Sequence, residues 1–236
     1  MQKSSNSFKK PPAKYQPRGL SILYEDRDIL VVDKECGLLT VSTDKVRDNT
    51  AYFRLNSYVR KGNQKSKNQV FIVHRLDRDT SGVLVFAKNE EAKRFLQAEW
   101  HDFTKKYYAV VCGTLPEKEG VISSYLVENS AHKVYSVNDP TKGKLAKTGY
   151  KVLQECNKYS LLEIDLFTGR KNQIRVHCAE GGFPVAGDKA YGQKDPGIKR
   201  LMLHAGSLTI LHPHTKEEMT FETGIPEYFK ALVRRL

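Results

Sequence analysis

Short apolar runs separated by turn residues dominate the chain and predict a β-rich fold. The segment LSILYEDRDILVVDK (residues 20–34) reads as two strands around a polar turn, and LLTVS (38–42) as a third. The same pattern recurs in VFIV (70–73), GVLVFAK (82–88), KYYAVVCG (106–113), GVISSYLVE (120–128), HKVYSV (132–137), TGYKVLQEC (148–156), YSLLEIDLF (159–167) and RLMLHAGSLTIL (200–211). Consecutive strands without intervening helices favour antiparallel pairing.

Four segments with capping signals or helical periodicity predict helices. They are AYFRLNSYVRK (51–61) capped by Asp48 or Asn49, a helix from Asn89 with Ala92, Phe95, Leu96 and Trp100 on one face, a helix from about Lys171 to Gly181-Gly182, and EYFKALVRR (227–235) after Pro226. We therefore predict an α+β fold with a mixed, mainly antiparallel sheet and flanking helices. No break in composition between residues 19 and 236 indicates a second domain.

Positive charge is in excess along the whole chain. Lys and Arg outnumber Asp and Glu by 39 to 27 in 236 residues, which gives a net charge of +12. A polyanion is the first partner to consider, although charge alone is equally compatible with a merely soluble surface. Residues 1–18 hold five cations, no acid and no apolar core, so they are expected to form a disordered basic arm and not a secretory signal.

The cysteines and the hydropathy indicate where the protein works. Cys36, Cys112, Cys156 and Cys178 lie far apart with no CxxC pair, which is typical of reduced, packed thiols. No apolar run approaches the about 18–20 residues that a bilayer span needs. We expect a cytoplasmic protein without a membrane partner.

The stretch VHRLDRDTSG (73–82) is the first candidate for chemistry, because it places Asp77 between Arg75 and Arg78 after an apolar run. Nearby cations keep a carboxylate ionised, as a nucleophile requires. A magnesium-dependent phosphotransferase is disfavoured, since no further acidic pair completes a metal cage and two cations beside a metal ligand are counterproductive. On spacing alone, a salt-bridged structural loop would be the better explanation of the stretch.

A second stretch, TGRKNQIRVHCAEGGFPVAGDKAYG (168–192), joins a Gly turn, several basic residues and a helix start that can bind phosphate. Together the two stretches resemble the RluA-type pseudouridine synthases, whose HRLD hallmark is His74-Arg75-Leu76-Asp77 here. Three further stretches fit the same family in the expected order: ILYEDRDILVVDKECGLL (22–39), KKYYAVVCG (105–113) and RLMLHAGSLTILHPHT (200–215). The resemblance spans roughly residues 20–225.

The resemblance implies a role for each matching residue. Asp77 corresponds to the essential aspartate, Tyr107 to the tyrosine that stacks on the target base, and Arg175 to the arginine that pairs with the catalytic carboxylate. Arg75 corresponds to the residue that fills the space of the flipped nucleotide, and Leu203 to an apolar border of the uracil pocket. Without the family order, Tyr107 and Leu203 would read as core residues and Arg175 as a surface cation.

Further contacts to the RNA or its target base are expected from the neighbours of these residues. The full expected set is His74, Arg75, Arg78, Thr80, Arg170, Lys171, Asn172, Gln173 and Leu203. The family commonly has Thr-His where this chain has Lys171-Asn172, and a proline near Glu35-Cys36, which bears on local contacts. An arm of 18 residues is also too short for the RNA-binding domain that many members carry at the N-terminus, since a small domain needs about 50 residues.

The expected activity is isomerisation of specific uridines in ribosomal or transfer RNA, by a monomer without cofactor or metal. His212-Pro213-His214 has no acid or Cys at ligand spacing and is typical of a turn. The main alternative is a non-enzymatic RNA-binding protein associated with the ribosome. In that case the HRLD loop would be only architectural.

Overall fold

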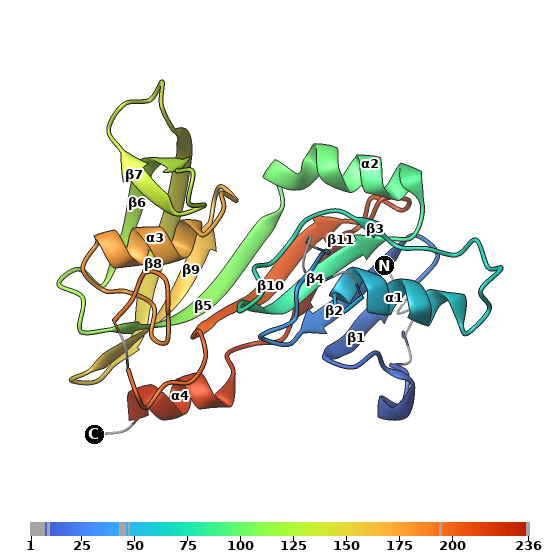
Figure 1. Cartoon of the computed structure of the whole chain (residues 1–236), viewed down its shortest axis with the longest axis horizontal. Helices are drawn as coiled ribbons and strands as arrows, with labels where there is room; N and C mark the ends of the chain where they lie inside the picture. The colour runs from blue at the N-terminus through green and yellow to red at the C-terminus, as the bar shows by residue number, and fades with distance from the viewer. Residues whose placement is uncertain (1–7, 9, 43–45, 47, 194, 235–236) are drawn as a thin grey trace, which may run out of the picture. The chain divides into compact units, whose positions relative to one another are not determined.

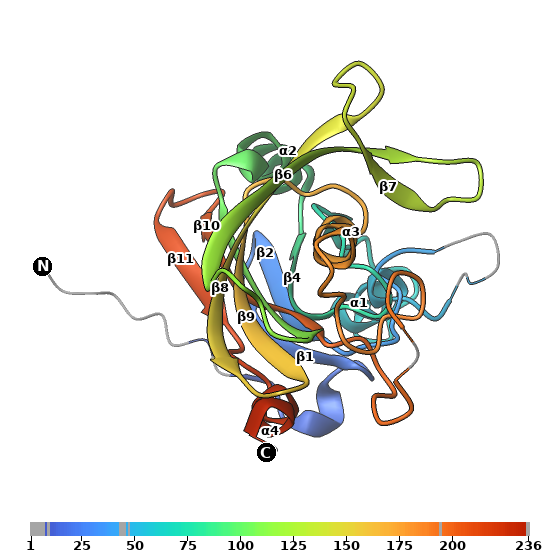
Figure 2. The ribbon, with the colours of Figure 1, turned by 90° about the vertical axis from the view of Figure 1, so that its left-hand side faces the viewer.

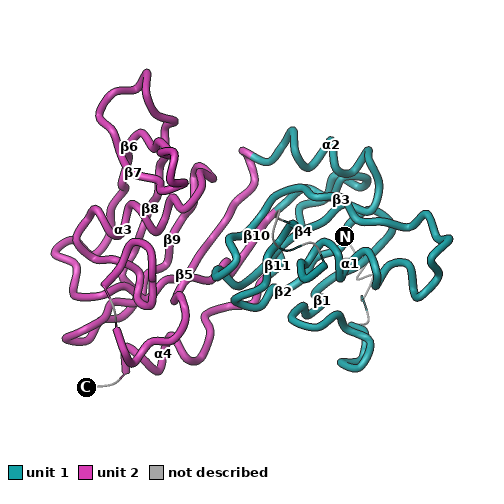
Figure 3. The backbone as a smooth tube through the Cα atoms, viewed as in Figure 1, with its two compact units in different colours: residues 1–100, 210–221 teal, residues 101–209, 222–236 magenta. Residues whose placement is uncertain are grey.

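The structure, a computed structural model, describes residues 8, 10–42, 46, 48–193 and 195–234, and within these ranges it has four α-helices and eleven strands (Figure 1). The fold is α+β with a mainly antiparallel sheet, as predicted. The chain forms two compact units, residues 1–100 with 210–221 and residues 101–209 with 222–236 (Figure 3). Because compact units can be parts of one domain, the single domain over 19–236 stays a prediction. Among the described helices, none has the length and hydropathy of a membrane span.

The first unit contains a strand order β1-β2-β4, with β3 also on β4, and all these pairings are antiparallel. The strands are β1 (Leu20–Glu25), β2 (Ile29–Lys34), β3 (Phe71–Ile72) and β4 (Ser81–Ala87). Every residue of β4 is buried, as are Ile29–Val32 of β2. Their apolar runs are continuous, not alternating, which is the pattern of strands covered on both faces.

Helices α1 (Ala51–Arg60) and α2 (Glu90–Ala98) belong to the same unit. α1 buries Ala51, Leu55 and Val59 at helical spacing, and α2 packs on β3 and β4. Asn89 caps α2 through its side chain, as predicted, whereas the cap of α1 is Thr50, which accepts from the N–H of Phe53 at 3.1 Å. The predicted caps Asp48 and Asn49 are thus wrong by one or two positions.

The second unit has the strand order β10-β5-β9-β8-β6-β7, joined by antiparallel ladders. The strands are β5 (Thr104–Cys112), β6 (Glu119–Glu128), β7 (Val134–Val137), β8 (Lys144–Glu155), β9 (Tyr159–Leu166) and β10 (Leu203–Leu211). β5 lies between β9 and β10, and its residues Ala109–Val111 are fully buried. Strands on both sides therefore hold the backbone of β5 in place.

Helices α3 (Gln173–Glu180) and α4 (Glu227–Arg234) pack on the strands of this unit. Figure 2 shows α3 lying along the concave side of the strands, with the β6–β7 hairpin extending past it. Ile174 and Cys178 of α3 and Phe229 and Val233 of α4 enter the main core cluster. Pro226 precedes α4 as predicted, since its fixed φ suits a helix start.

Four further segments differ from the predicted pattern. Residues 38–42 form no strand, because only an isolated bridge joins Leu39 to Thr50. Strand β11 (Glu218–Glu222), which was not predicted, follows the HPH turn. The described part of the predicted arm, Phe8 and 10–18, includes a 3₁₀ turn η1 (Ala13–Tyr15), and a second 3₁₀ turn, η2 (Glu99–His101), follows α2.

Candidate functional site

The HRLD loop of the first unit is held by two buried polar side chains that the sequence analysis did not single out. Lys34 is 0% exposed, and its Nζ donates to the carbonyls of Glu35 (3.1 Å), Leu38 (2.8 Å) and Arg78 (3.1 Å). Thr40 Oγ1 donates to the carbonyl of Leu76 at 2.7 Å and accepts from its N–H at 3.2 Å. Because a buried ammonium needs its acceptors, these bonds fix the backbone on both sides of Asp77.

The predicted residues of this loop occupy different environments. Asp77 is partly buried and Arg75 is exposed. The His74 ring stacks on Trp100 at 4.2 Å between centroids, and its Nε2 accepts from the N–H of Val85 at 3.1 Å. His74 therefore secures the loop against β4.

Arg78 and Thr80 follow Asp77 in the loop. The Arg78 guanidinium binds Asp79 through two contacts of 3.1 and 3.2 Å, and this partner raises the pKa of Arg78. Its side chain is 62% exposed, so it is accessible to a phosphate. Thr80 is buried, and its N–H donates to the carbonyl of Asp77 at 3.2 Å, which closes the turn after that residue.

Tyr107 and Leu203 lie on neighbouring strands of the second unit. The β5–β10 register pairs Tyr107 with Ala205 and Ala109 with Leu203, so both side chains are on one face of the sheet. Tyr107 is partly buried against the main core, and Leu203 is 3% exposed. The two predicted borders of a base pocket are thus diagonal neighbours.

A β-bulge in β10 lies directly beside Tyr107. The register shifts between Ala205 and Ser207, which leaves Gly206 unpaired. A Cβ at Gly206 would lie 2.4 Å from two ring carbons of Tyr108, a distance that excludes any side chain there. Tyr108 therefore packs over the bare backbone of the bulge.

The loop before α3 is built around Gln173, which is 2% exposed. Its amide donates to the Lys147 carbonyl (3.0 Å) and Thr148 Oγ1 (2.9 Å), and its Oε1 accepts from Thr168 Oγ1 (2.7 Å) and the N–H of Arg170 (3.0 Å). Gln173 is among the residues that the family resemblance predicts to contact RNA. In the structure its polar groups shape the loop from inside the protein.

Arg170 and Lys171 extend from this loop to the surface. Both line a groove of about 520 Å³ whose other cations are Lys142 and Lys144. Lys171 pairs with Glu128 of the same groove at 2.5 Å, and the Arg170 Nε donates to the carbonyl of Leu145 at 3.0 Å. Cations exceed carboxylates in this groove, as a phosphate-binding surface requires.

Arg175 of α3 forms a buried ion pair with Asp188. Its Nε and Nη2 donate to the two carboxylate oxygens of Asp188, each at 2.7 Å, and its Nη1 donates to Asn172 Oδ1 at 2.7 Å. The guanidinium also lies 5.0 Å from the ring centre of Tyr191. Bidentate binding of this kind fixes the plane of the guanidinium.

Asp188 itself is fully enclosed, with a side-chain exposure of 0%. Burial alone would raise its pKa, but the Arg175 guanidinium and the N–H groups of Ala190 and Tyr191 bring the pKa below the usual value. Gly187 allows this turn, since a Cβ at that position would lie 2.0 Å from the carbonyl oxygen of Arg200. The Gly-Asp pair in the Arg175 stretch was the available sequence signal for Asp188.

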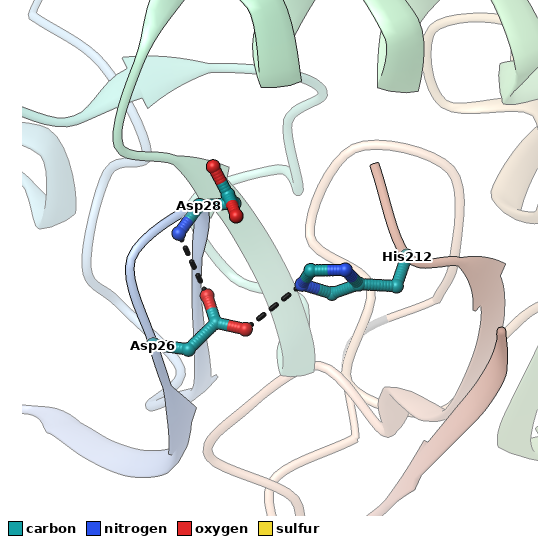
Figure 4. Close-up of side chains that lie close together, drawn as sticks. All are labelled: Asp26, Asp28 and His212. Atoms are coloured by element: carbon teal, nitrogen blue, oxygen red, sulfur yellow. Dashed lines mark hydrogen bonds and ion pairs between the residues drawn. The ribbon is translucent and has the colours of Figure 1, made fainter. Parts of the chain in front are cut away.

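One group of possible metal ligands occurs among the described residues, namely Asp26, Asp28 and His212 (Figure 4). Asp26 Oδ1 accepts the N–H groups of Asp28 and Ile29, both at 2.8 Å, and Oδ2 accepts from Tyr24 (3.0 Å) and His212 Nε2 (2.8 Å). His212 Nδ1 accepts from the N–H of Thr215 at 3.1 Å, so the HPH motif is the predicted turn. These bonds make the group a structural link between two loops.

Asp77 and Arg75 belong to the first unit, whereas Tyr107, Arg175 and Leu203 belong to the second. Each unit thus prepares its own part of the predicted site. The pairing of Asp77 with Arg175 stays a prediction. The local departures from the family pattern also have structural partners: Asn172 accepts from Arg175, and the N–H of Glu35, which a proline would lack, donates to the Gly19 carbonyl at 3.0 Å.

Comparison with known proteins shows which sequence family the chain matches. The family model described as RNA pseudouridylate synthase matches residues 28–180. The uncharacterized RNA pseudouridine synthase YlyB of Bacillus subtilis is 36% identical over 234 residues. The match covers 94% of this chain and 74% of YlyB. The ribosomal large subunit pseudouridine synthase D of Nitrosomonas europaea is 35% identical over 92% of this chain and 65% of its own length.

Solved structures show the same fold. Human RNA pseudouridylate synthase domain containing 4 superposes with a TM-score of 0.75 at 24% identity, over 91% of this chain and 92% of that chain. Human RNA pseudouridylate synthase domain containing 1 gives 0.70 at 29% identity, over 92% and 87%. The similarity therefore extends over both compact units.

Proposed function

Because the chain belongs to the RNA pseudouridylate synthase family and is thus an RNA-modifying isomerase, we propose that it isomerises uridines of ribosomal RNA, with transfer RNA as the second substrate class, and that Asp77 is the nucleophile. A relative that is 35% identical is named for the large ribosomal subunit, which favours ribosomal RNA. The main alternative, a non-enzymatic RNA-binding protein, is not supported by this family.

The observation that carries the proposal is the fixed loop around Asp77. Lys34 and Thr40 hold the backbone before and after this carboxylate, and Arg75 and Arg78 remain exposed beside it. A nucleophile that is pre-positioned in this way loses little conformational freedom in the reaction. A carboxylate needed only for a surface ion pair would not require a buried lysine beneath it.

The reaction breaks the N1–C1′ bond of a uridine within RNA and forms a C5–C1′ bond. The C5 hydrogen leaves as a proton and N1 gains one, so the product is an isomer. Extrusion of the base from its stack costs a few kcal/mol. We assign refilling of the gap to Arg75 and stacking on the uracil to Tyr107, which contributes ~1–3 kcal/mol per base. Leu203 borders the pocket, and Arg175 keeps the carboxylate of Asp77 ionised.

In this scheme Asp77 acts on the ribose C1′ or assists cleavage of the glycosidic bond. The remaining residues of the proposed RNA surface are His74, Arg78, Thr80, Arg170, Lys171, Asn172 and Gln173. Their environments support different contributions: Arg170, Lys171 and Arg78 contact phosphate, whereas His74, Thr80, Asn172 and Gln173 hold the two loops in shape. No redox step occurs, so the reaction needs no cofactor.

The test compares Asp77→Asn with Asp79→Asn. Both substitutions exchange a carboxylate for an amide in the same loop, but only the first removes the proposed nucleophile. Release of tritium from C5-labelled uridine in ribosomal and transfer RNA measures turnover. We expect no turnover with folded Asp77→Asn and nearly wild-type turnover with Asp79→Asn.

Thermal melting and RNA binding serve as the controls for this comparison. Retained turnover by folded Asp77→Asn would refute the assignment of the nucleophile. Wild-type protein that is inactive on every cellular RNA would refute the proposed substrates.

A further inference from the structure

A groove of about 460 Å³ separates the segment before β1 from one face of α1, within the first unit. Lys14, Tyr15 and Arg18 line one wall. Phe53, Arg54 and Tyr58 of α1 line the other, and Arg54 and Tyr58 share a helix face because they are four positions apart. The volume is in the range of sites that bind small ligands or single groups of a larger one.

Hydrogen bonds to the rest of the unit hold both walls in place. The Gln16 side chain accepts from the N–H of Ile22 at 2.9 Å and donates to the Pro11 carbonyl at 2.9 Å. The Arg54 guanidinium donates to the Arg18 carbonyl and to Asn49 Oδ1, which joins one wall to the other. Tyr58 donates to Glu25 Oε2 at 2.9 Å. The groove is thus a built feature of the unit.

The side chains that face solvent here are of two kinds. Tyr15 is 61% exposed and Phe53 is 45% exposed, which places two large aromatic rings at the surface of one groove. Lys14, Arg18 and Arg54 supply positive charge, against the single carboxylate of Asp48. Exposed aromatic rings interleaved with cations are the composition of surfaces that bind single-stranded nucleic acid.

We propose that this groove binds an unpaired segment of the RNA substrate, with bases stacked on Tyr15 and Phe53 and phosphates near Lys14 and Arg18. The inference rests on the proposed function for the identity of the RNA. Its location supports it, because the Gly19 carbonyl beside Arg18 accepts from the N–H of Glu35, and the neighbouring Lys34 binds the Arg78 carbonyl. The groove therefore adjoins the turn that fixes the HRLD loop.

The charge in the groove distinguishes RNA from an apolar protein partner. A protein-docking groove would bring apolar side chains together without three cations on its two walls. Stacking on a ring is tolerant of sequence, so the groove adds affinity for flanking unpaired nucleotides and not selection of one base. Duplex RNA lacks free base faces and gains nothing from these rings.

The test measures binding of a short oligouridylate and of an abasic oligomer of the same length at one salt concentration. The double variant Tyr15→Ala/Phe53→Ala should bind the oligouridylate at least tenfold more weakly and the abasic oligomer as wild type does. Tyr228→Ala is the matched control, since this ring is also exposed beside a cation, Arg200 at 4.7 Å, but lies outside the groove. It should leave both affinities unchanged.

Lys14→Ala/Arg18→Ala should weaken both oligomers, because phosphate contacts do not depend on the base. Tyr228→Ala should also leave turnover unchanged. Equal affinity of wild type and Tyr15→Ala/Phe53→Ala for the oligouridylate would contradict the proposed RNA binding in the groove. Equal affinity of wild type for the two oligomers would contradict it as well. A wild-type protein that shows the stacking effect but no turnover on any RNA would refute the proposed function and leave the groove standing.

Discussion

Asp188 shows how one enclosed carboxylate can set the geometry of a cation that we propose to be functional. It holds Arg175 through two bonds of 2.7 Å while two backbone N–H groups hold Asp188 itself. A guanidinium fixed in this way presents its remaining face in a single orientation. Asp188 therefore acts as a positioning residue for Arg175.

The residue-scale prediction concerns Asp188→Asn in two backgrounds. Loss of the charge partner leaves Arg175 less well oriented, so turnover should fall about 10- to 100-fold, since small displacements of catalytic groups have effects of this size. In the Arg175→Ala background the same substitution should have almost no further effect on turnover, because positioning through Arg175 is then already lost. Additive losses would show an independent role, and melting curves control for stability.

At this scale the sequence does not predict the environment of a residue. The family resemblance singles out Asp77 and Arg175 as candidates, and their roles stay predictions. Spacing does not distinguish Gln173, a buried organiser of its loop, from an exposed RNA contact. The burial of Lys34 and Asp188 cannot be predicted from the sequence, because charged residues are rarely buried. Their partners are backbone groups or side chains that only the fold brings close.

Strand β10 combines a bulge with a buried histidine two residues earlier. His204 is 5% exposed, and its Nε2 bonds to Thr223 Oγ1 at 2.8 Å. Burial, with a smaller contribution from the charge of Arg200, lowers the pKa of His204 to about 4. The neutral imidazole is thus part of the packing between β10 and the segment before α4.

The element-scale prediction is a pH dependence of stability. Because the folded pKa lies below the usual value of 6.5, the unfolded chain binds the extra proton first. Stability should therefore be complete above about pH 6.5 and fall towards pH 4, by an amount on the order of 3 kcal/mol from this group. Denaturant unfolding of wild type and His204→Gln over this range measures this contribution, and the pH dependence of stability should be smaller in the variant.

His132→Gln is the control for the same exchange at a surface position, since the side chain of His132 is 83% exposed. His177, which burial also holds at a lowered pKa, accounts for part of any dependence that remains in His204→Gln. Identical profiles for wild type and His204→Gln would contradict the prediction.

Most elements follow from apolar pattern, and the exceptions have physical reasons. Residues 38–42 have strand composition, but their backbone serves other bonds: the carbonyls of Leu39 and Thr40 accept the N–H groups of Ala51 and Tyr52. Strand β11 has the sequence EMTFE, whose two acids and short apolar content give a weak signal. Tertiary pairing decides both cases.

The whole molecule carries its positive charge in several places at once. The N-terminal segment holds five cations within 18 residues, and the groove before α3 holds four more. Each phosphate contact releases counterions, so the logarithm of RNA affinity should depend steeply on the logarithm of salt concentration. We therefore expect both units to contribute to the electrostatic part of RNA binding.

The whole-molecule prediction is that deletion of residues 1–18 weakens RNA binding and flattens its salt dependence. A slope of about −0.7 to −0.9 per phosphate contact implies a measurable change if only two or three contacts are lost. Titrations of one RNA at several salt concentrations determine the slope for wild type and the deletion. An unchanged slope would remove the segment from the interface.

The buried environment of Lys34 allows opening of the HRLD loop to be measured by acetylation of this side chain. With no exposed surface and three carbonyls around its Nζ, Lys34 should resist acetylation by a water-soluble reagent while the exposed lysines of the chain react within the same time. Acetylation of Lys34 requires the loop to open, so its rate reports the rate or frequency of that opening. Peptide mass spectrometry measures this rate. RNA that stabilises the loop should slow the acetylation of Lys34, and no probe has to be attached to the protein beforehand.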